Sequence, residues 1–282
     1  MRDPAVYIDT EIYPLNDPCS DNYSTMVAAI RSKLSEDGCA VLKGFVKKEI
    51  IGKLVREADK AAPHGHNSKS RTNVYFSEDD PSLDPSHPRR RFYDRSNAFI
   101  PADNFGKGSI LREIYEWQPF FKFVRDALDE GESRFFRYAD PLADVIVNMA
   151  EEGNGFPWHF DTNNYTVTLA IQNAEEGGDF EYAPNIREGD ENFDAVRDVL
   201  DETSDKVTSL KLHPGDLQIF KGRYSLHRVA PLRGKTPRYV AIYSYVEESG
   251  MVGSPERTQQ LYGRVLPIHL ERAGLRADEY LD

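Results

Sequence analysis

The spacing of hydrophobic and polar positions changes near the middle of the chain. In residues 24–36, 47–62 and 112–136, apolar residues recur every three or four positions, as on the buried face of a helix. The short apolar run at 39–45 predicts a buried strand between the first two helices. We therefore expect a largely helical first half, with Ser24 as the cap of the first helix.

Residues 62–109 show little periodicity and are rich in Pro, Ser, Asp, Asn and Arg. Irregular segments of this length inside a compact domain are more often functional than neutral connectors. The segment is therefore expected to form a loop that covers a site.

The second half consists of short β-branched or aromatic segments separated by Gly, Pro, Asn or Asp. The predicted strands are 144–150, 165–172, 178–184, 206–212, 216–220 and 238–246. A helix is expected at 193–202, and Ser254 and Pro255 predict the start of a C-terminal helix. Because most of these strands have no helix between them, an antiparallel barrel or jelly roll is favoured over a parallel sheet.

The predicted fold class is mainly β with flanking helices, built on a double-stranded β-helix (jelly-roll, cupin-like) core. No internal repeat or low-complexity linker divides the 282 residues, which are 39% hydrophobic. We expect a single domain over residues 1–282. Its parts would be the N-terminal helices, strand and covering loop (1–143), the jelly-roll core (144–246) and a C-terminal helix (247–282).

Charge and composition narrow the choice of partners. The net charge of −12 argues against general binding to nucleic acids, which rests on clustered Lys and Arg. The only dense basic run, at 87–95, fits a solvated loop, with an anion contact as the alternative. No stretch approaches the roughly 20 apolar residues of a membrane span, and the two cysteines lie in unrelated contexts. These features predict a cytoplasmic protein with a small-molecule substrate and no nucleic-acid or membrane partner.

Candidate metal chemistry begins in "PWHFDTNNYTVTLAIQ", residues 157–172. In an extended segment, His159 and Asp161 project to the same face. Two ligands do not hold a metal firmly, and His227 in "LHRV" is the candidate third. Two His and one carboxylate on one face of Fe(II) leave positions open for a co-substrate and O₂.

Arg238 follows His227 at the start of a predicted strand that points back into the same barrel. A guanidinium offers a planar fork that matches a carboxylate at two points and stays charged when buried. A dicarboxylic co-substrate could chelate iron at one end while Arg238 binds the other, which is how 2-oxoglutarate is used.

With "HFD" at 159–161, "LHRV" at 226–229 and Arg238, the sequence resembles the iron(II)- and 2-oxoglutarate-dependent dioxygenase superfamily over roughly 144–246. The stretch "WHFDTNNYTVTLAIQNAEEGGDFEYAPNIR" is similar to the group that contains free-amino-acid hydroxylases and halogenases. The resemblance implies Fe(II), 2-oxoglutarate and O₂ as cofactor and co-substrates.

The resemblance also assigns residue roles. It implies that His159, Asp161 and His227 are the catalytic metal ligands and that Arg238 anchors 2-oxoglutarate. Asn148 lies on a preceding strand, where some members use a polar side chain to bond the co-substrate carboxylate.

Asp161 bears on the reaction, because the group's halogenases carry a small residue in its place. Its presence implies hydroxylation of an unactivated C–H, with release of succinate and CO₂. The expected substrate is a small polar metabolite such as a free amino acid or a derivative, whose carboxylate Arg71 or Arg95 of the covering loop could bind.

Several alternatives stay open. The same scaffold could desaturate, demethylate or cyclise a natural-product or carrier-bound intermediate, act as a cupin-type enzyme without 2-oxoglutarate, or serve as a non-catalytic ligand-binding module. His213 fits a turn better than a fourth metal ligand, and His64 and His66 fit a loop. Arg187 and Glu181 are expected in solvent-facing ion pairs, with a substrate role as the alternative. The oligomeric state is open, with a homodimer among the options.

Overall fold

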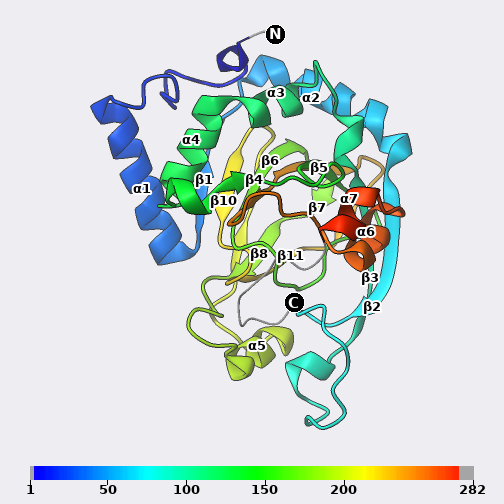
Figure 1. Cartoon of the computed structure of the whole chain (residues 1–282). Coiled ribbons are helices and arrows are strands. Elements are labelled where there is room, and N and C mark those ends of the chain that lie inside the picture. Colours follow the sequence, from blue (N-terminus) through cyan, green and yellow to red (C-terminus); the bar gives the residue numbers. More distant parts are fainter. Residues whose placement is uncertain (1–2, 273–282) are drawn as a thin grey trace.

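The computed structural model describes residues 3–272, and two antiparallel sheets organise this part of the chain (Figure 1). The seven-stranded sheet runs in the order β1 (Cys39–Leu42), β10 (Leu217–Phe220), β6 (Thr166–Gln172), β13 (Arg238–Tyr243), β5 (Val145–Ala150), β3 (Tyr93–Ile100), β2 (His66–Thr72). The three-stranded sheet runs in the order β11 (Leu226–Val229), β8 (Phe180–Ala183), β9 (Thr208–Leu210). Two short pairs are β12 (Leu232–Arg233) with β7 (Glu176–Gly177), and β14 (Tyr245–Val246) with β4 (Phe136–Arg137).

Helices flank the sheets on several sides (Figure 1). They are α1 (Asp21–Asp37), α2 (Lys48–Ala61), α3 (Ile110–Glu116), α4 (Gln118–Ala127), α5 (Phe193–Leu200), α6 (Pro255–Tyr262) and α7 (Pro267–Glu271). Short 3-10 helices span Pro4–Val6, Ala62–His64, Pro88–Arg90, Ala102–Asn104 and Glu132–Arg134. The predicted fold class, mainly β with flanking helices around a jelly-roll core, is confirmed. None of the helices within residues 3–272 has the length and apolarity to cross a membrane.

The alternation of side chains along the large sheet separates the core from the site. On β6, Val167 and Leu169 join the main core together with residues of α1, α2 and α4, whereas Thr166 and Thr168 face a cavity. The other central strands divide in the same way, because successive side chains of a strand point to opposite faces. One face of the sheet is thus packed under helices, and the other is free to carry polar side chains.

Two helix boundaries differ from the sequence expectation. The first helix is capped by Ser20, whose side chain accepts from the Tyr23 N–H, and not by Ser24, which lies inside the helix. The helix expected over 112–136 is broken at Trp117, whose backbone is extended. Pro119 occupies the first turn of α4, where a missing N–H costs no helical hydrogen bond. The expected start of the C-terminal helix at Ser254 and Pro255 is confirmed.

The prediction that residues 62–109 form a loop is wrong in part, because β2 and β3 lie within this range. The sequence of β2, "HNSKSRT", has no hydrophobic alternation to reveal it. The strand lies at the edge of the large sheet and is held by pairing along its length with β3. An edge strand needs few apolar side chains, so the backbone pairing with β3 makes this segment a strand despite its polar sequence.

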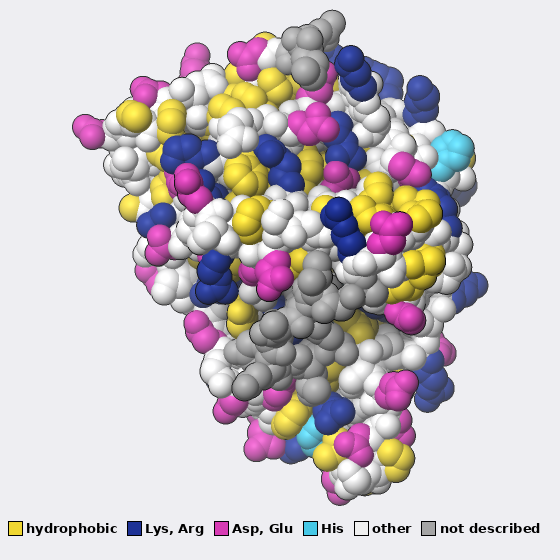
Figure 2. Space-filling view, viewed as in Figure 1, with side chains coloured by type: hydrophobic (Ala, Val, Ile, Leu, Met, Phe, Trp, Pro, Cys, Tyr) yellow, Lys and Arg dark blue, Asp and Glu magenta, His cyan; other side chains and the backbone are white. Residues whose placement is uncertain are grey.

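On the face shown in Figure 2, basic and acidic side chains are interspersed rather than gathered by sign. The coloured part of this face therefore offers no broad basic surface of the kind that binds phosphate backbones.

Candidate metal and co-substrate site

Backbone pairing brings the two histidines of the predicted triad together. The N–H of His159 donates to the carbonyl of His227 at 2.9 Å, and the reverse bond is 3.0 Å. The ring centroids consequently lie 4.3 Å apart. Oδ1 of Asp161 lies 3.6 Å from Nε2 of His159 and 3.4 Å from Nε2 of His227. One ligand atom from each of the three residues lies within 4.8 Å of the others.

Each imidazole is oriented through its other nitrogen. Nδ1 of His159 lies 2.7 Å from the Pro157 carbonyl, and Nδ1 of His227 lies 2.8 Å from the Ser225 carbonyl. A carbonyl only accepts, so Nδ1 of each ring carries a proton, and Nε2 of each ring is turned toward Asp161. Burial, together with the neighbouring His227, lowers the pKa of His159 to about 4. This ring is therefore neutral near pH 7, as a metal ligand must be.

Gly222 and Thr166 restrict the position of the Asp161 carboxylate. A Cβ on Gly222 would lie 2.1 Å from Oδ2 of Asp161 and 2.7 Å from Oγ1 of Thr166, so only glycine leaves room there. The Thr166 hydroxyl donates to the same Oδ2, which leaves Oδ1 facing the histidines. Burial alone would raise the pKa of Asp161, but the adjacent imidazoles hold it well below its usual value. Two imidazoles and an ionised carboxylate form a donor set that fits Fe(II).

A buried cavity beside this cluster contains Arg238. The residue begins β13 and is 6% exposed, and its side chain forms no hydrogen bond or ion pair with any residue in the described range. Burial lowers the pKa of Arg238 to about 10, against a smaller opposing effect of Asp179. A buried and unpaired guanidinium favours an anionic ligand, since an uncompensated charge in an apolar setting is costly.

Asn148 lies on β5, opposite Val240 of β13, and it lines the same cavity. Its side-chain Oδ1 is buried and has no hydrogen-bond partner among the described residues. A ligand in the cavity could therefore bond to it, and its role in binding the co-substrate stays a prediction.

The other histidines considered from the sequence do not lie in this cluster. The side chain of His213 is 69% exposed, in a turn where its N–H donates to Asp216. Within residues 3–272, no other group of His, Cys, Asp and Glu side chains has metal-binding spacing, so His64 and His66 form none.

Arg187 was expected to face solvent, but its side chain is buried. It is 0% exposed, pairs with Glu191 and lies 4.9 Å from the Phe160 ring centroid. The aromatic side chains that cover it come from distant segments, which a local motif does not reveal. Glu181 does form an ion pair, with Arg228 at 2.6 Å.

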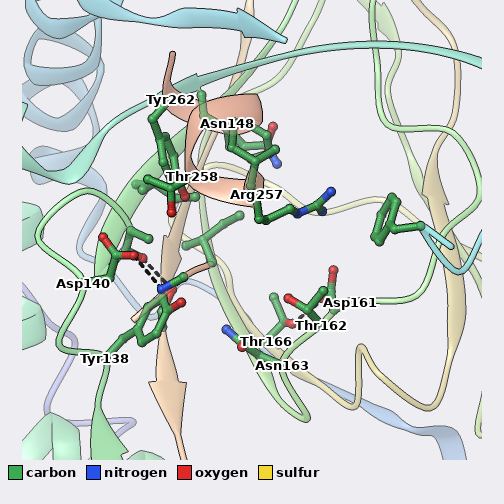
Figure 3. Close-up of a pocket in the computed structure, with 18 of the residues that line it drawn as sticks. Tyr138, Asp140, Asn148, Asp161, Thr162, Asn163, Thr166, Arg257, Thr258 and Tyr262 are labelled. Carbon is green, nitrogen blue, oxygen red and sulfur yellow. Dashed lines mark hydrogen bonds between the residues drawn. The ribbon is translucent and has the colours of Figure 1, made fainter. Parts of the chain in front are cut away.

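A second, inner cavity of about 150 Å³ adjoins the first and shares His159, Asp161 and Asn148 with it (Figure 3). Its wall includes Arg95 of β3 and Arg257 of α6. Arg95 was a sequence candidate, whereas no sequence signal pointed to Arg257, because only tertiary packing brings α6 to this place. An outer cleft of about 750 Å³ shares Phe76, Tyr138 and Arg257 with the inner cavity and also contains Arg71.

The family described as Halogenase D matches residues 23–262 of this chain. The chain belongs to the Halogenase D family. No curated protein matches it.

Solved structures share the fold of this Halogenase D family member at low identity. The non-haem α-ketoglutarate-dependent epimerase SnoN from nogalamycin biosynthesis has a TM-score of 0.54 at 11% identity, covering 79% of this chain and 83% of its own. AviO1 from Streptomyces viridochromogenes Tue57 has a TM-score of 0.54 at 14% identity, covering 79% and 95%. A Pseudomonas putida prolyl-4-hydroxylase has a TM-score of 0.50 at 13% identity, covering 79% and 99%.

Proposed function

We propose that this protein is an Fe(II)- and 2-oxoglutarate-dependent oxygenase that hydroxylates an unactivated C–H of a free amino acid or a derivative. The carbon–hydrogen bond becomes a carbon–hydroxyl bond, and 2-oxoglutarate with O₂ yields succinate and CO₂. The observation that carries the proposal is the convergence of His159, Asp161 and His227 beside the buried, unpaired Arg238.

The chain's own residues would bind, orient and exclude water. His159 and His227 offer Nε2 to Fe(II), and Asp161 offers a carboxylate oxygen. Iron, when bound, supplies the activation of O₂. Arg238 would form two parallel hydrogen bonds to the distal carboxylate of 2-oxoglutarate. The apolar walls of the cavity exclude water and strengthen that pairing; they are Phe156, Phe180, Phe220, Val229, Val240 and Ile242.

Asp161 supports hydroxylation rather than halogenation, although the family is described as Halogenase D. Its carboxylate, which accepts a hydrogen bond from the Thr166 hydroxyl, would take the metal position that a halide needs to be open. We therefore expect products heavier by one oxygen atom, with no chlorine incorporated when chloride is supplied.

A second candidate is the oxidative tailoring of a larger metabolite. It is supported by the outer cleft of about 750 Å³, which is continuous in its lining with the inner cavity through Phe76, Tyr138 and Arg257. Under this alternative no free amino acid would stimulate succinate formation, and a carrier-bound or larger substrate would.

Anaerobic addition of Fe(II) and 2-oxoglutarate tests the first step of the proposal. We expect a visible charge-transfer band in the wild type and its loss in Arg238→Leu, with the apparent affinity for 2-oxoglutarate falling about 10- to 100-fold. Arg233→Leu, at an exposed position on β12, is the matched control and should keep the band. An unchanged affinity in Arg238→Leu would contradict the role of Arg238, and no band in the wild type would contradict the cofactor assignment.

The second step is a screen for substrate-stimulated succinate formation across free amino acids, with the product mass read in parallel. A gain of one oxygen atom supports hydroxylation, whereas a loss of two hydrogens indicates desaturation. If no free amino acid is coupled to succinate formation, the substrate class proposed here is wrong.

A further inference from the structure

Two consecutive glycines, Gly177 and Gly178, open the segment "GGDFEY" at 177–182. Both have a positive φ, of 68° and 75°, which is a backbone conformation that L side chains rarely adopt. A Cβ on Gly177 would lie 2.2 Å from the carbonyl oxygen of Pro231, so this glycine allows the close pairing of β7 with β12. Gly177 is thus required by the backbone of this strand pair.

Gly178 faces the side chain of Arg238 instead. A Cβ on Gly178 would lie 3.2 Å from Cδ and 3.7 Å from Nε of Arg238, and 3.6 Å from Cβ of Leu232. The shortest of these separations is tighter than ordinary van der Waals contact between carbon atoms. Gly178 is buried, whereas Gly177 is exposed, so a methyl group on Gly178 could not turn into solvent. Such a group would push the stem of the arginine aside.

Packing has to hold the side chain of Arg238, because polar partners do not. It forms no hydrogen bond or ion pair with any residue in the described range. Burial lowers its pKa, and Asp179 opposes this shift only from beyond ion-pair distance. The pairing of β13 with β6 also shifts register between Tyr239 and Val240, directly after Arg238. Because such irregularities re-aim neighbouring side chains, the direction of the guanidinium depends on the atoms packed against its stem.

The same segment continues into the wall of the cavity proposed for 2-oxoglutarate. Phe180 lines that cavity together with Arg238, and its ring centroid lies 5.7 Å from that of His227. Phe180 pairs with Val229 of β11, the strand that carries His227. One short stretch of chain therefore lies against the arginine and against a metal ligand, with Gly178 at the arginine.

We propose that Gly178 is a positioning residue for the co-substrate. The absence of a side chain there lets Arg238 take the orientation in which two of its N–H groups meet the distal carboxylate of 2-oxoglutarate. A guanidinium bonds a carboxylate at two points only when their planes match, so a displaced stem loses one of the two parallel bonds. This inference rests on the proposed function, which supplies the co-substrate, and it adds a residue that acts through Arg238.

Gly178→Ala tests the inference, with the affinity for 2-oxoglutarate read from the anaerobic charge-transfer band. We expect binding to weaken about tenfold, which corresponds to the loss of one charge-assisted hydrogen bond. The affinity for Fe(II), titrated without 2-oxoglutarate, should change by less than about twofold, because the metal ligands are untouched. A general loss of structure would weaken both affinities, so the pair of measurements separates positioning from unfolding.

Gly153→Ala is the matched control for backbone strain. Gly153 has a φ of 85°, close to that of Gly178, and it is exposed. No atom lies within 4 Å of its added Cβ. The cost of an L side chain at positive φ therefore arises in both variants, and denaturant unfolding measures it. Wild-type affinity for 2-oxoglutarate in Gly153→Ala would assign the loss in Gly178→Ala to the contact with Arg238.

A double-mutant cycle shows whether Gly178 acts through Arg238. In the Arg238→Leu background, Gly178→Ala should weaken 2-oxoglutarate binding further by less than about twofold, because no guanidinium is left to displace. A further loss of about tenfold in this background would overturn the inference. Unchanged affinity in Gly178→Ala, an equal loss in Gly153→Ala, or a parallel loss of Fe(II) affinity would overturn it as well.

A wild type without the band would overturn the cofactor assignment, and a second titration keeps that outcome distinct. Calorimetry of the metal-free protein with 2-oxoglutarate reads the arginine end alone, since no iron is there to be chelated. Binding that Arg238→Leu abolishes and Gly178→Ala weakens would support the positioning role without iron. Binding that Arg238→Leu abolishes and Gly178→Ala leaves unchanged would overturn it. A wild type that binds 2-oxoglutarate in neither form would overturn both the assignment and the inference.

Discussion

The two cavities that meet at His159 and Asp161 are built in different ways. The cavity that we propose for 2-oxoglutarate, called the 2-oxoglutarate cavity below, is formed chiefly by the inner faces of paired strands, among them β5, β6, β10 and β13. The inner cavity takes part of its wall from segments outside this set, including α6 and the residues around Phe76. The first is fixed by the backbone pairing of a sheet. The second depends on how a terminal helix packs against β2 and β3, so substrate preference can change while the co-substrate site stays the same.

The largest expected effect follows from filling the space beside Asp161. Gly222→Ala would place a Cβ 2.1 Å from Oδ2, which forces the carboxylate away from the histidines. We expect metal affinity to fall by about 10- to 100-fold, as for the loss of an outer-shell partner. Titration with Fe(II) under anaerobic conditions measures this change.

Gly106→Ala is the control for that substitution, because no atom lies within 4 Å of its added Cβ. Equal Fe(II) affinity of the two variants would show that the close approach of Gly222 does not position Asp161.

The second effect should be confined to the inner cavity. His269→Ala removes the imidazole whose Nε2 lies 3.1 Å from Oδ1 of the buried Asp140. Loss of the polar neighbour of a buried group costs about 1–3 kcal/mol, so the free energy of unfolding should fall by that order. Because Asp140 and α6 both line the inner cavity, KM for the amino acid should rise while the affinity for 2-oxoglutarate is retained.

Denaturant unfolding and separate titrations of the two ligands measure the effects of His269→Ala. His213→Ala, in an exposed turn, should change neither property and serves as the control. An equal loss of affinity for both ligands would show that a change at Asp140 disturbs the two cavities together.

The smallest effect concerns reactivity next to the 2-oxoglutarate cavity. Nε2 of Gln218 donates to Sγ of Cys39 at 3.3 Å, and burial raises the pKa of the Cys39 thiol to about 12. At pH 8 only about one such thiol in 10⁴ is ionised. Iodoacetamide should therefore label the exposed Cys19 of the folded protein and reach Cys39 only after unfolding.

Mass spectrometry counts the modified thiols, and Cys19→Ser should remain unlabelled while folded. Rapid labelling of Cys39 in the folded protein would show that the β1 edge opens, against the rigidity inferred for this cavity.

Much of the 2-oxoglutarate cavity could be predicted from the sequence. The alternation in "YTVTLAIQ" assigns Val167 and Leu169 to one face and Thr166 and Thr168 to the other, which is how they lie. The β-branched and aromatic residues of 238–246 likewise predicted a strand that begins at Arg238, as β13 does. Such features depend on the pleat of a single strand and on local turn residues, which adjacent sequence determines.

Only the tertiary structure decided the inner cavity and several other features outside it. The polar strand β2 gave no hydrophobic signal, and Arg187 is buried by aromatic rings from other segments. Likewise, the buried Nη1 of Arg95, without a partner among the described residues, and the approach of Arg257 to the Phe76 ring depend on which distant elements pack together. Whether a buried charge lacks a partner is a property of its whole surroundings, and a local pattern of residues does not contain that information.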